Sequence, residues 1–381
     1  MGEGDRYWEA LKARDPRFDG VFFVGVSTTG IYCRPVCPAR TPGKDRCTFF
    51  RHSSEAERAG FRACLRCRPE LAPGNAPVDA RSRLVRRAVS RIESRGWDGS
   101  ATELARSLGV TDRHLRRAFD AELGTSPSAW ERGHRIGLAR QLIRETSLPV
   151  EQIGAMVGYP NPRSFRAAFH RVCGRAPTEV RRGSAGGDAV VVKLAARPPY
   201  DAGSLLRFLA ARQIPGVERV DPAAGLYARS TRIGPHAGWW SAAFDGGTWV
   251  VSISTGLSRA VVQVVARIRS ALDLDARPDR IAEVLAADPL LGPRVLANPG
   301  LRVPGAADPF ELAVRAVLGQ QVSVKAATTL AGRLVERFGA PLDGPGLTAA
   351  FPTAAELAAA PVDALAAIGL PGSRARTVAS L

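Results

Sequence analysis

Helical spacing of apolar residues dominates the middle of the chain, from about residue 83 to 182. Two stretches there, fifty residues apart, share one pattern of a short helix, a glycine turn and a second helix. The second helices carry apolar residues four positions apart, which share one helix face and indicate a buried side. These residues are Leu115 and Phe119 in the first copy, and Phe165 and Phe169 in the second. The pattern predicts two helix-turn-helix units, joined by a longer helix over 127–147.

The following part of the chain mixes strand and helix patterns. Between 188 and 275 three stretches have strand character and two have helical spacing, which predicts an α+β fold. From about residue 281 the pattern is wholly helical. The predicted strands cover 190–192, 226–233 and 249–254, and the predicted helices cover 203–213 and 259–272.

Stretches rich in glycine, proline and alanine separate these parts and are typical of linkers. They lie at 71–77 and 183–187. A length of 381 residues favours two to three domains at roughly 150 residues each, and the pattern divides the chain more finely. The predicted parts are a cysteine-rich domain over 1–75, a helical domain over 83–182, an α+β subdomain over 188–275 and a helical region over 281–381.

The chain is strongly basic, with a net charge of +17 from 53 basic and 36 acidic residues. The excess is concentrated between 81 and 190, where 20 basic residues stand against 11 acidic ones. Such a stretch is typical of a protein that binds a polyanion, and nucleic acid is the commonest polyanion in the cytosol. An ordinary solvated surface is the alternative, because arginine outnumbers lysine as it would under GC-rich codon usage.

Composition and motifs exclude several other classes. Hydrophobic residues make up 45% and charged residues 23%, which excludes wholesale disorder. The longest uncharged run, 20–33, is too short and polar to span a bilayer, and the first residues lack a secretory signal pattern. We therefore expect a cytoplasmic protein with no membrane partner. There is no phosphate-binding loop, dinucleotide fingerprint or zinc-peptidase motif, and no Pro-Cys-His-Arg element that would indicate a methylguanine methyltransferase.

Cysteine spacing supplies the strongest chemical signal. Five of the six cysteines lie in the N-terminal part, and disulfides are not expected in a reducing compartment. Three residues separate Cys33 from Cys37, and two separate Cys64 from Cys67. Two short pairs of thiolate ligands are typical of a tetrahedral Zn²⁺ site. Spacing alone favours a purely structural metal, and it leaves Cys47 outside the site as a small apolar residue.

The residues around these cysteines resemble the zinc domain of the Ada family. The resemblance rests on FFVGVSTTGIYCRPVCPAR over 22–40 and GFRACLRCRP over 60–69. In that family the domain repairs DNA methylphosphotriesters, and one zinc-bound thiolate takes the methyl group irreversibly. The resemblance implies Zn²⁺ as cofactor and Cys33 as the methyl acceptor, and coordination would keep this sulfur deprotonated. The candidates for guiding the DNA backbone toward it, with an ordinary surface role as the alternative, are Arg34, Arg40, Arg46 and Arg51.

The helical part, roughly 83–182, resembles the AraC-type DNA-binding domain, which the Ada family also carries after its zinc domain. TDRHLRRAF over 111–119 matches NPRSFRAAF over 161–169. The outward-facing arginines of each second helix lie where such a helix meets the base edges and phosphates of double-stranded DNA, and solubilising charge is the alternative. These arginines are Arg113, Arg116, Arg117, Arg163 and Arg166. Cys173 matches Leu123 in the repeat, which predicts a core residue.

The C-terminal part resembles AlkA, the 3-methyladenine DNA glycosylase. The resemblance rests on RPPYD over 197–201, NPGLRVPG over 298–305 and RAVLGQQVSV over 315–324. It implies an enzyme that extrudes the damaged nucleotide and fills the gap with a side chain. That position matches Gln321, beside Gln320, and the alternative is that both glutamines cap a helix junction.

One element of that family is not found in these residues. GLPGSR over 369–374 resembles the glycosylase hairpin but lacks its second glycine, and no acidic residue follows Asp363. The glycosylase catalytic Asp is therefore absent from the 381 residues, and we interpret the region as truncated. A carboxylate stabilises the charge that develops on the sugar, and losing such a partner costs about 10²–10³ in rate. We expect weak or absent base excision.

Together, the motifs predict an Ada-like alkylation sensor fused to the front part of an AlkA-like glycosylase. The fold class is multidomain α+β, with a small zinc domain, an all-α double helix-turn-helix domain, an α+β AlkA-like N-terminal subdomain and a partial all-α helix-hairpin-helix domain. Cys33 would accept one methyl group and switch a transcription regulator that acts on promoter DNA with RNA polymerase in the nucleoid. Two alternatives remain: a regulator with purely structural zinc, and a full glycosylase whose last part lies beyond these residues. The sequence carries no signal of oligomeric state.

Overall fold

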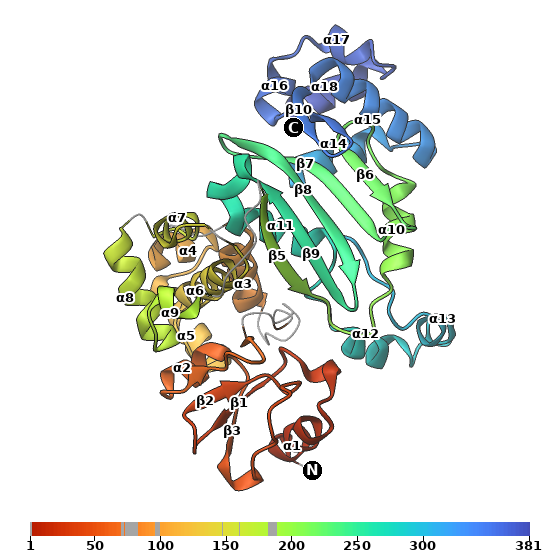
Figure 1. Ribbon diagram of the computed structural model, residues 1–381. Coiled ribbons are helices and arrows are strands. Elements are labelled where there is room, and N and C mark those ends of the chain that lie inside the picture. Colours follow the sequence, from red (N-terminus) through yellow and green to blue (C-terminus); the bar gives the residue numbers. More distant parts are fainter. Residues whose placement is uncertain are drawn as a thin grey trace.

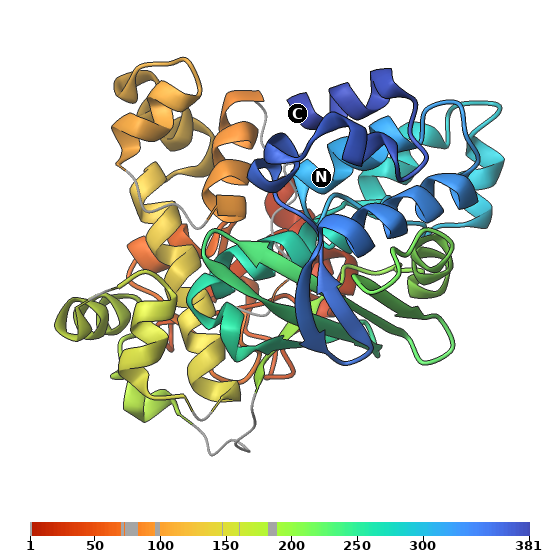
Figure 2. The same ribbon diagram turned by 90° about the horizontal axis from the view of Figure 1, so that it is seen from above.

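The structure, a computed structural model, describes most of the chain. Figure 1 shows an N-terminal domain at one end, a helical domain beside it, a central sheet, and further helices at the C-terminal end. In Figure 2, seen from above, the helical domain and the C-terminal helices lie on different sides of the sheet. The described residues are 2–69, 72, 83–95, 100–146, 148–159, 161–181 and 189–381. Apart from Ala72, the two predicted linkers lie outside them.

The N-terminal domain consists of α1 (Glu3–Ala13), η1 (Pro16–Phe18), β1 (Phe23–Val26), β2 (Ile31–Cys33), η2 (Lys44–Arg46), β3 (Cys47–Phe50), α2 (Ser53–Arg58) and β4 (Arg62–Ala63). Its sheet has the order β3-β1-β2-β4, with β4 parallel to β2 and the other pairs antiparallel. Aromatic residues fill the small core: Phe22 and Tyr32 are fully buried, and the Tyr7 ring stacks on Phe22 with centroids 4.4 Å apart. Large rings bury much area per residue, which suits so small a core.

The helical domain consists of α3 (Arg83–Arg95), α4 (Ala101–Ser107), α5 (Asp112–Leu123), α6 (Pro127–Glu145), α7 (Val150–Met156), α8 (Pro162–Cys173) and α9 (Pro177–Val180). The predicted units are present as α4 with α5 and α7 with α8, and α6 joins them. The side chains of Thr111 and Asn161 accept hydrogen bonds from the first turns of α5 and α8. Gly124 and Gly174 end these helices at φ of 59° and 65°, a conformation that favours glycine.

The central part is a five-stranded antiparallel sheet with helices packed against it. Its elements are β5 (Ala189–Ala195), α10 (Ala202–Ala210), β6 (Glu218–Asp221), β7 (Leu226–Ile233), β8 (His236–Asp245), β9 (Thr248–Ser254), η5 (Thr255–Ala260) and α11 (Val261–Ala271). The strand order is β5-β9-β8-β7-β6. The predicted strands and helices are present as β5, β7, β9, α10 and α11. The strands β6 and β8 were not predicted. Around the buried Trp240, β8 carries Gly, Ser and Ala, which have little strand preference.

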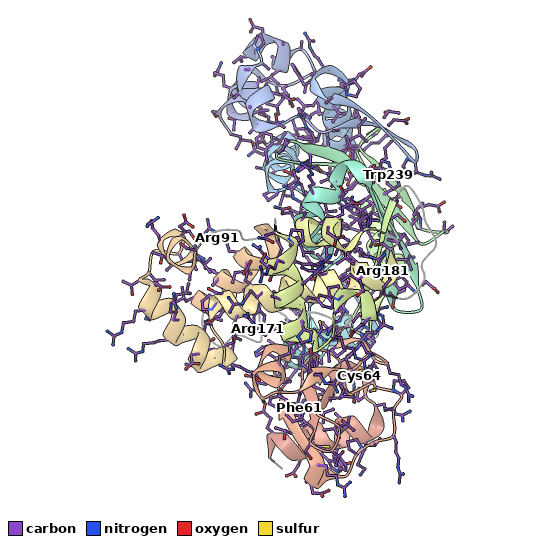
Figure 3. All side chains as sticks on the ribbon, turned by 60° about the vertical axis from the view of Figure 1, so that its left-hand side comes forward. Phe61, Cys64, Arg91, Arg171, Arg181 and Trp239 are labelled. Atoms are coloured by element: carbon purple, nitrogen blue, oxygen red, sulfur yellow. The ribbon has the colours of Figure 1, made fainter. Side chains whose placement is uncertain are left out.

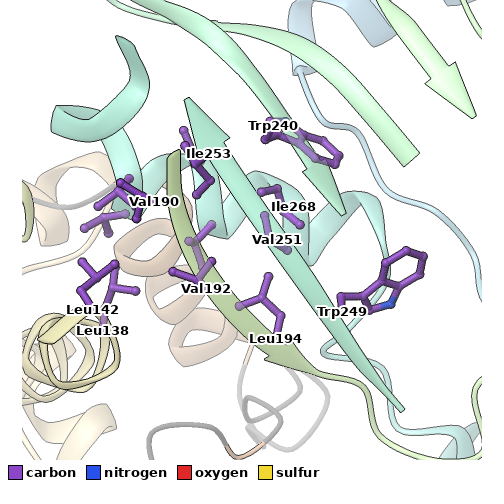
Figure 4. Close-up of a cluster of buried hydrophobic side chains, with 14 of the residues drawn as sticks. Leu138, Leu142, Val190, Val192, Leu194, Trp240, Trp249, Val251, Ile253 and Ile268 are labelled. Carbon is purple, nitrogen blue, oxygen red and sulfur yellow. The ribbon is translucent and has the colours of Figure 1, made fainter. Parts of the chain in front are cut away.

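One hydrophobic core runs from the helical domain into the sheet. Leu138 and Leu142 of α6 are buried in the same cluster as Val190 and Val192 of β5, as Figure 4 shows. A close-packed core of this kind transmits strain, so α6 and the sheet do not behave as independent parts. Helix α6, the second helix-turn-helix unit and the sheet therefore form one packed unit, which the linker composition between them did not indicate.

The C-terminal part holds α12 (Pro278–Leu285), α13 (Gly292–Ala297), α14 (Pro309–Leu318), α15 (Val324–Phe338), α16 (Ala354–Ala359), α17 (Val362–Ala366) and α18 (Gly372–Ser380). The prediction of a wholly helical pattern was wrong at one place, since an antiparallel hairpin of β10 (Ala340–Gly344) and β11 (Leu347–Ala350) follows α15. Leu347 of β11 is buried. The strands carry Ala, Pro, Asp and Gly, which give a weak strand signal. Among the described helices, none has both the length and the apolar character needed to cross a bilayer.

A buried ion cluster joins the sheet to the C-terminal helices. Arg229 of β7 pairs with Glu311 of α14, and its Nη1 lies 3.3 Å from Oε1 of Glu218 in β6. Arg315 Nη1 lies 3.1 Å from Glu218 Oε2 and 3.2 Å from Glu311 Oε1. Buried charges are tolerated when they are paired and hydrogen-bonded. The cluster therefore fixes α14 against the sheet.

Candidate functional site

Four cysteine sulfurs meet beside the ends of β2 and β4. The sulfur atoms of Cys33, Cys37, Cys64 and Cys67 all lie within 4.8 Å of one another. The parallel pairing of the two strands brings them together, since Cys33 ends β2 and Cys64 directly follows β4. Cys33 is partly exposed, whereas the other three are buried. Cys47 lies outside this cluster, and its Sγ donates to the Gly43 carbonyl oxygen at 3.3 Å.

The donor set fits Zn²⁺, because four soft sulfurs in a compact group match its tetrahedral coordination. Hydrogen bonds with Cys37, Cys64 and Cys67 raise the pKa of the Cys33 thiol well above its usual range. Ionising all four sulfurs at this separation would place four negative charges together, which repel one another. A bound divalent cation offsets this electrostatic repulsion. With Zn²⁺ bound, the cluster would hold four thiolates around the cation.

Arg34 fixes the second cysteine pair. Its backbone N–H donates to the Cys67 sulfur at 3.3 Å, and its Nη1 donates to the Cys67 carbonyl oxygen at 3.1 Å. Its Nε donates to Oδ1 of the buried Asp19 at 2.8 Å, and only 13% of the Arg34 side chain is exposed. The geometry gives Arg34 a structural role in the cluster, and its contact with DNA stays a prediction.

A cavity of about 440 Å³ lies beside Cys33. Cys33, Cys37 and Cys64 line it, with apolar side chains from α1, β1 and β2. No carboxylate lines this cavity among the residues that the structure describes. Its cationic lining residues are Arg40, Arg62, Arg66 and Arg175. Four arginines around the partly exposed Cys33 suit a substrate with anionic groups such as a DNA backbone.

The second helix of each helix-turn-helix unit presents its arginines to solvent. All five predicted arginines are exposed, while the four apolar residues of the opposite face are fully buried, as predicted. Arg116 Nε donates to Asp112 Oδ2 at 2.8 Å, and Arg166 pairs with Glu151. The exposed arginines are Arg113, Arg116, Arg117, Arg163 and Arg166. Their contacts with bases and phosphates stay a prediction.

Helix α6 ties the helical domain to the cysteine cluster. Arg144 Nη1 donates at 3.0 Å to the carbonyl oxygen of Leu65, which lies between Cys64 and Cys67 in the chain. Near the start of α6, the Trp130 ring meets His52 edge-on with centroids 5.0 Å apart. No motif in the sequence indicated these contacts, because they join residues more than 75 positions apart.

A titratable pair lies beneath the same junction. The hydroxyl of the fully buried Tyr32, which precedes Cys33, donates to Glu57 Oε1 at 2.7 Å. Burial raises the pKa of Glu57 to about 7, although the bond from Tyr32 and the charge of Arg140 in α6 oppose this shift. Desolvation disfavours a carboxylate charge, so Glu57 titrates near neutral pH.

The predicted glycosylase residues lie in the turn between α14 and α15. Gln320 and Gln321 are both exposed there, and Gln321 has a φ of 56°. Ser323 caps α15 by accepting a hydrogen bond from the Ala326 N–H at 3.2 Å, so neither glutamine supplies that cap. An exposed glutamine on a tight turn is compatible with insertion into DNA, which stays a prediction.

Family models match nearly the whole chain. The metal binding domain of Ada matches residues 6–70, and a helix-turn-helix domain matches 104–183. The AlkA N-terminal domain matches 191–308, and the HhH-GPD superfamily base excision DNA repair protein model matches 314–381. These matches confirm the resemblances to Ada, to helix-turn-helix regulators and to AlkA.

One curated relative matches almost the whole chain, and two others each match about half of it. A probable bifunctional transcriptional activator/DNA repair enzyme AlkA of Mycobacterium tuberculosis is 37% identical over 399 residues, covering 99% of this chain and 77% of the relative. The bifunctional transcriptional activator/DNA repair enzyme Ada of Escherichia coli is 34% identical over 182 residues, or 47% of this chain and 49% of that protein. DNA-3-methyladenine glycosylase 2 of Escherichia coli is 38% identical over 187 residues, or 49% of this chain and 64% of that protein. The chain therefore belongs to the family of bifunctional transcriptional activators and DNA repair enzymes that join an Ada-type zinc domain and helix-turn-helix units to an AlkA-type glycosylase region, and its cofactor is Zn²⁺.

Proposed function

We propose that Cys33 accepts a methyl group from a DNA methylphosphotriester, once per molecule, and that this modification switches DNA binding by the helix-turn-helix units. The observation that carries the proposal is the position of Cys33. It is the partly exposed sulfur of the four-cysteine cluster, and it faces a cavity lined by arginines. The remaining ligands are Cys37, Cys64 and Cys67.

The transfer balances without any proton movement. Bound Zn²⁺ supplies the positive charge that keeps the sulfurs deprotonated at neutral pH. The Cys33 thiolate attacks the methyl carbon of the triester, and the new S–C bond forms as the C–O bond breaks. The electron pair of that bond stays on the phosphate oxygen, so a phosphodiester anion leaves and a thioether remains. Because nothing in the reaction removes the methyl group from sulfur, each molecule acts once.

The same step changes the charge that faces DNA. A divalent cation with four thiolates has a formal charge of −2, and methylating one sulfur leaves −1. The cluster then repels DNA phosphates less. The Leu65 carbonyl, bonded to Arg144 of α6, lies within the second cysteine pair, so the change arises next to the helical domain. We propose promoter DNA and RNA polymerase as partners, in the nucleoid of the cytoplasm.

For the glycosylase region we propose that the 381-residue chain, taken alone, excises methylated bases weakly or not at all. The support is that no acidic residue follows Asp363 in these residues. A carboxylate aimed at the developing sugar charge is worth about 10²–10³ in rate. Release of 3-methyladenine by this purified chain at an ordinary glycosylase rate would contradict the proposal.

The mass of the intact protein tests the methyl transfer. The zinc-loaded chain is mixed with a duplex carrying one methylphosphotriester, and we expect a gain of one methyl group, located on the peptide that contains Cys33. Cys33→Ala should gain nothing, whereas Cys47→Ser, changed outside the cluster, should react like the wild type. An unmodified wild-type chain with bound zinc would instead support a regulator with purely structural zinc.

A further inference from the structure

The cavity beside Cys33 is not built by the zinc domain alone. Cys173 and Arg175, at the end of α8 in the second helix-turn-helix unit, line it together with the cluster cysteines. Gly174 packs so closely on β4 that a Cβ there would collide with the Arg62 side chain. In Figure 3, Arg171 of α8 and Cys64 label the two parts that meet here. The site proposed for methyl transfer therefore has a wall from the DNA-binding domain.

The two helix-turn-helix units can be compared at the ends of their second helices, α5 and α8. Gly124 ends α5 as Gly174 ends α8, but the residues on either side differ. Leu123 and Thr125 of the first unit are buried, and neither lines the cavity. The second unit has Cys173 and the exposed Arg175 at the matching positions. The repeat thus departs from its own pattern where α8 meets the cavity.

The guanidinium of Arg175 is available for a ligand. Among the described residues, no hydrogen bond or ion pair holds its side chain, in contrast to Arg166 of α8, which pairs with Glu151. The cavity contains three further arginines and, in its described lining, no carboxylate to neutralise them. Guanidinium groups bind phosphate oxygens with paired hydrogen bonds.

We infer that Arg175 binds a phosphate of the DNA strand that carries the methylphosphotriester, so that the second helix-turn-helix unit completes the methyl-acceptor site. The inference rests on the proposed function and adds the residue that holds the substrate backbone. Arg175 contacts the unmodified phosphate next to the triester, while the triester itself lies at Cys33. Methyl capture and DNA binding then share α8 and the turn that follows it, since Arg163 and Arg166 of α8 are the predicted DNA contacts and Arg175 lies two residues beyond its end.

Kinetics of methyl uptake test this role. Arg175→Ala and Arg175→Lys are compared as zinc-loaded full chains with the control Arg171→Ala, which changes an exposed arginine in the last turn of α8, outside the cavity. The probe is a duplex with one methylphosphotriester and no promoter sequence. We expect Arg175→Ala to slow uptake about tenfold, the size of one charge-assisted contact. Arg175→Lys should recover part of the rate, and Arg171→Ala should match the wild type.

Two further readouts separate substrate binding from a structural effect. One lost phosphate contact lowers the slope of log affinity against log salt concentration by about 0.9, and Arg175→Ala should show this change. Methylation of Cys33 by methyl iodide, which has no backbone to bind, should proceed equally in all variants. Equal uptake from DNA by Arg175→Ala and Arg171→Ala would overturn the inference, as would a parallel loss with methyl iodide. A wild-type chain that reacts with methyl iodide but never with the triester would overturn the proposed function itself.

Discussion

Leu142 of α6 tests whether the second helix-turn-helix unit, with α6, and the central sheet are one unit. Its side chain is fully buried in the cluster that also contains Val190 and Val192 of β5. Leu→Ala at such a site costs about 2–5 kcal/mol, depending on how far the neighbours collapse into the cavity. Collapse is restricted here, because Gln141 Nε2 donates to the Lys193 carbonyl oxygen at 2.7 Å and holds α6 at its distance from β5. We therefore expect Leu142→Ala to cost about 3 kcal/mol.

Hydrogen exchange followed by mass spectrometry measures this effect locally. A loss of about 3 kcal/mol corresponds to roughly 100-fold faster exchange of amides that open with the whole unit. We expect this acceleration in β5 and β9 as well as in α6. The control is Leu104→Ala, which removes an equally buried leucine from a separate cluster around α3, α4 and α5. It should accelerate exchange there and leave β5 and β9 unchanged. Faster exchange in α6 alone, with β5 and β9 still protected in Leu142→Ala, would refute the single unit.

Three other changes have predicted outcomes. Removing zinc with a chelator should abolish methyl uptake and make the four cluster thiols reactive in a thiol titration, while circular dichroism keeps the signal of the helical domain. Burial raises the pKa of Glu57 to about 7, so the carboxyl group binds its proton more tightly in the folded protein than in the unfolded one. The contribution of this protonation to stability is fully present below the unfolded pKa near 4.5 and is lost as the pH rises through 7. Urea unfolding should therefore find Glu57→Gln equal to the wild type at pH 4.5 but more stable at pH 8, by up to about 3 kcal/mol. Glu311→Ala leaves the buried Arg229 with one partner fewer and should cost about 3 kcal/mol in urea unfolding. Glu283→Ala, which breaks an exposed pair with Arg280, should cost less than about 1 kcal/mol.

Sequence reasoning succeeded where the signal is local. Each cysteine pair is a short-range motif that the sequence shows directly. The fold has only to bring the two pairs together, which the parallel pairing of β2 with β4 does. The helix-turn-helix units were predicted from Leu115 and Phe119 and their repeat, because helical spacing directly gives the buried face. The hairpin of β10 and β11 was missed, since its strands are short and carry Ala, Pro, Asp and Gly, which have little strand preference, and their burial depends on contacts with the central sheet.

Contacts between domains left no such signal. Arg144 bonds to Leu65 across 79 positions, and nothing in either neighbourhood marks the pair. Arg175 did leave a trace, because it replaces a threonine of the first repeat, but a single difference between repeats has no meaning until the fold places it beside the cysteine cluster. Arg34 has a contact that its sequence position does not indicate: the fold pairs it with the buried Asp19, while its contact with DNA stays a prediction.

The proposed switch does not require the domains to move. The zinc domain already contacts the C-terminal ends of α5 and α8. A Cβ at Gly124 would collide with Glu55 of α2, and one at Gly174 would collide with Arg62 of β4. Methylation of Cys33 then acts by removing one negative charge near the bound backbone, and phosphates carry no sequence information. The gain in affinity should therefore be similar for any duplex long enough to reach both helices and the zinc domain, and it should shrink as salt screens the charge. Affinities of the methylated and unmethylated chain for two unrelated duplexes of equal length test this, and a gain confined to one duplex would show that methylation rearranges the base-reading helices instead.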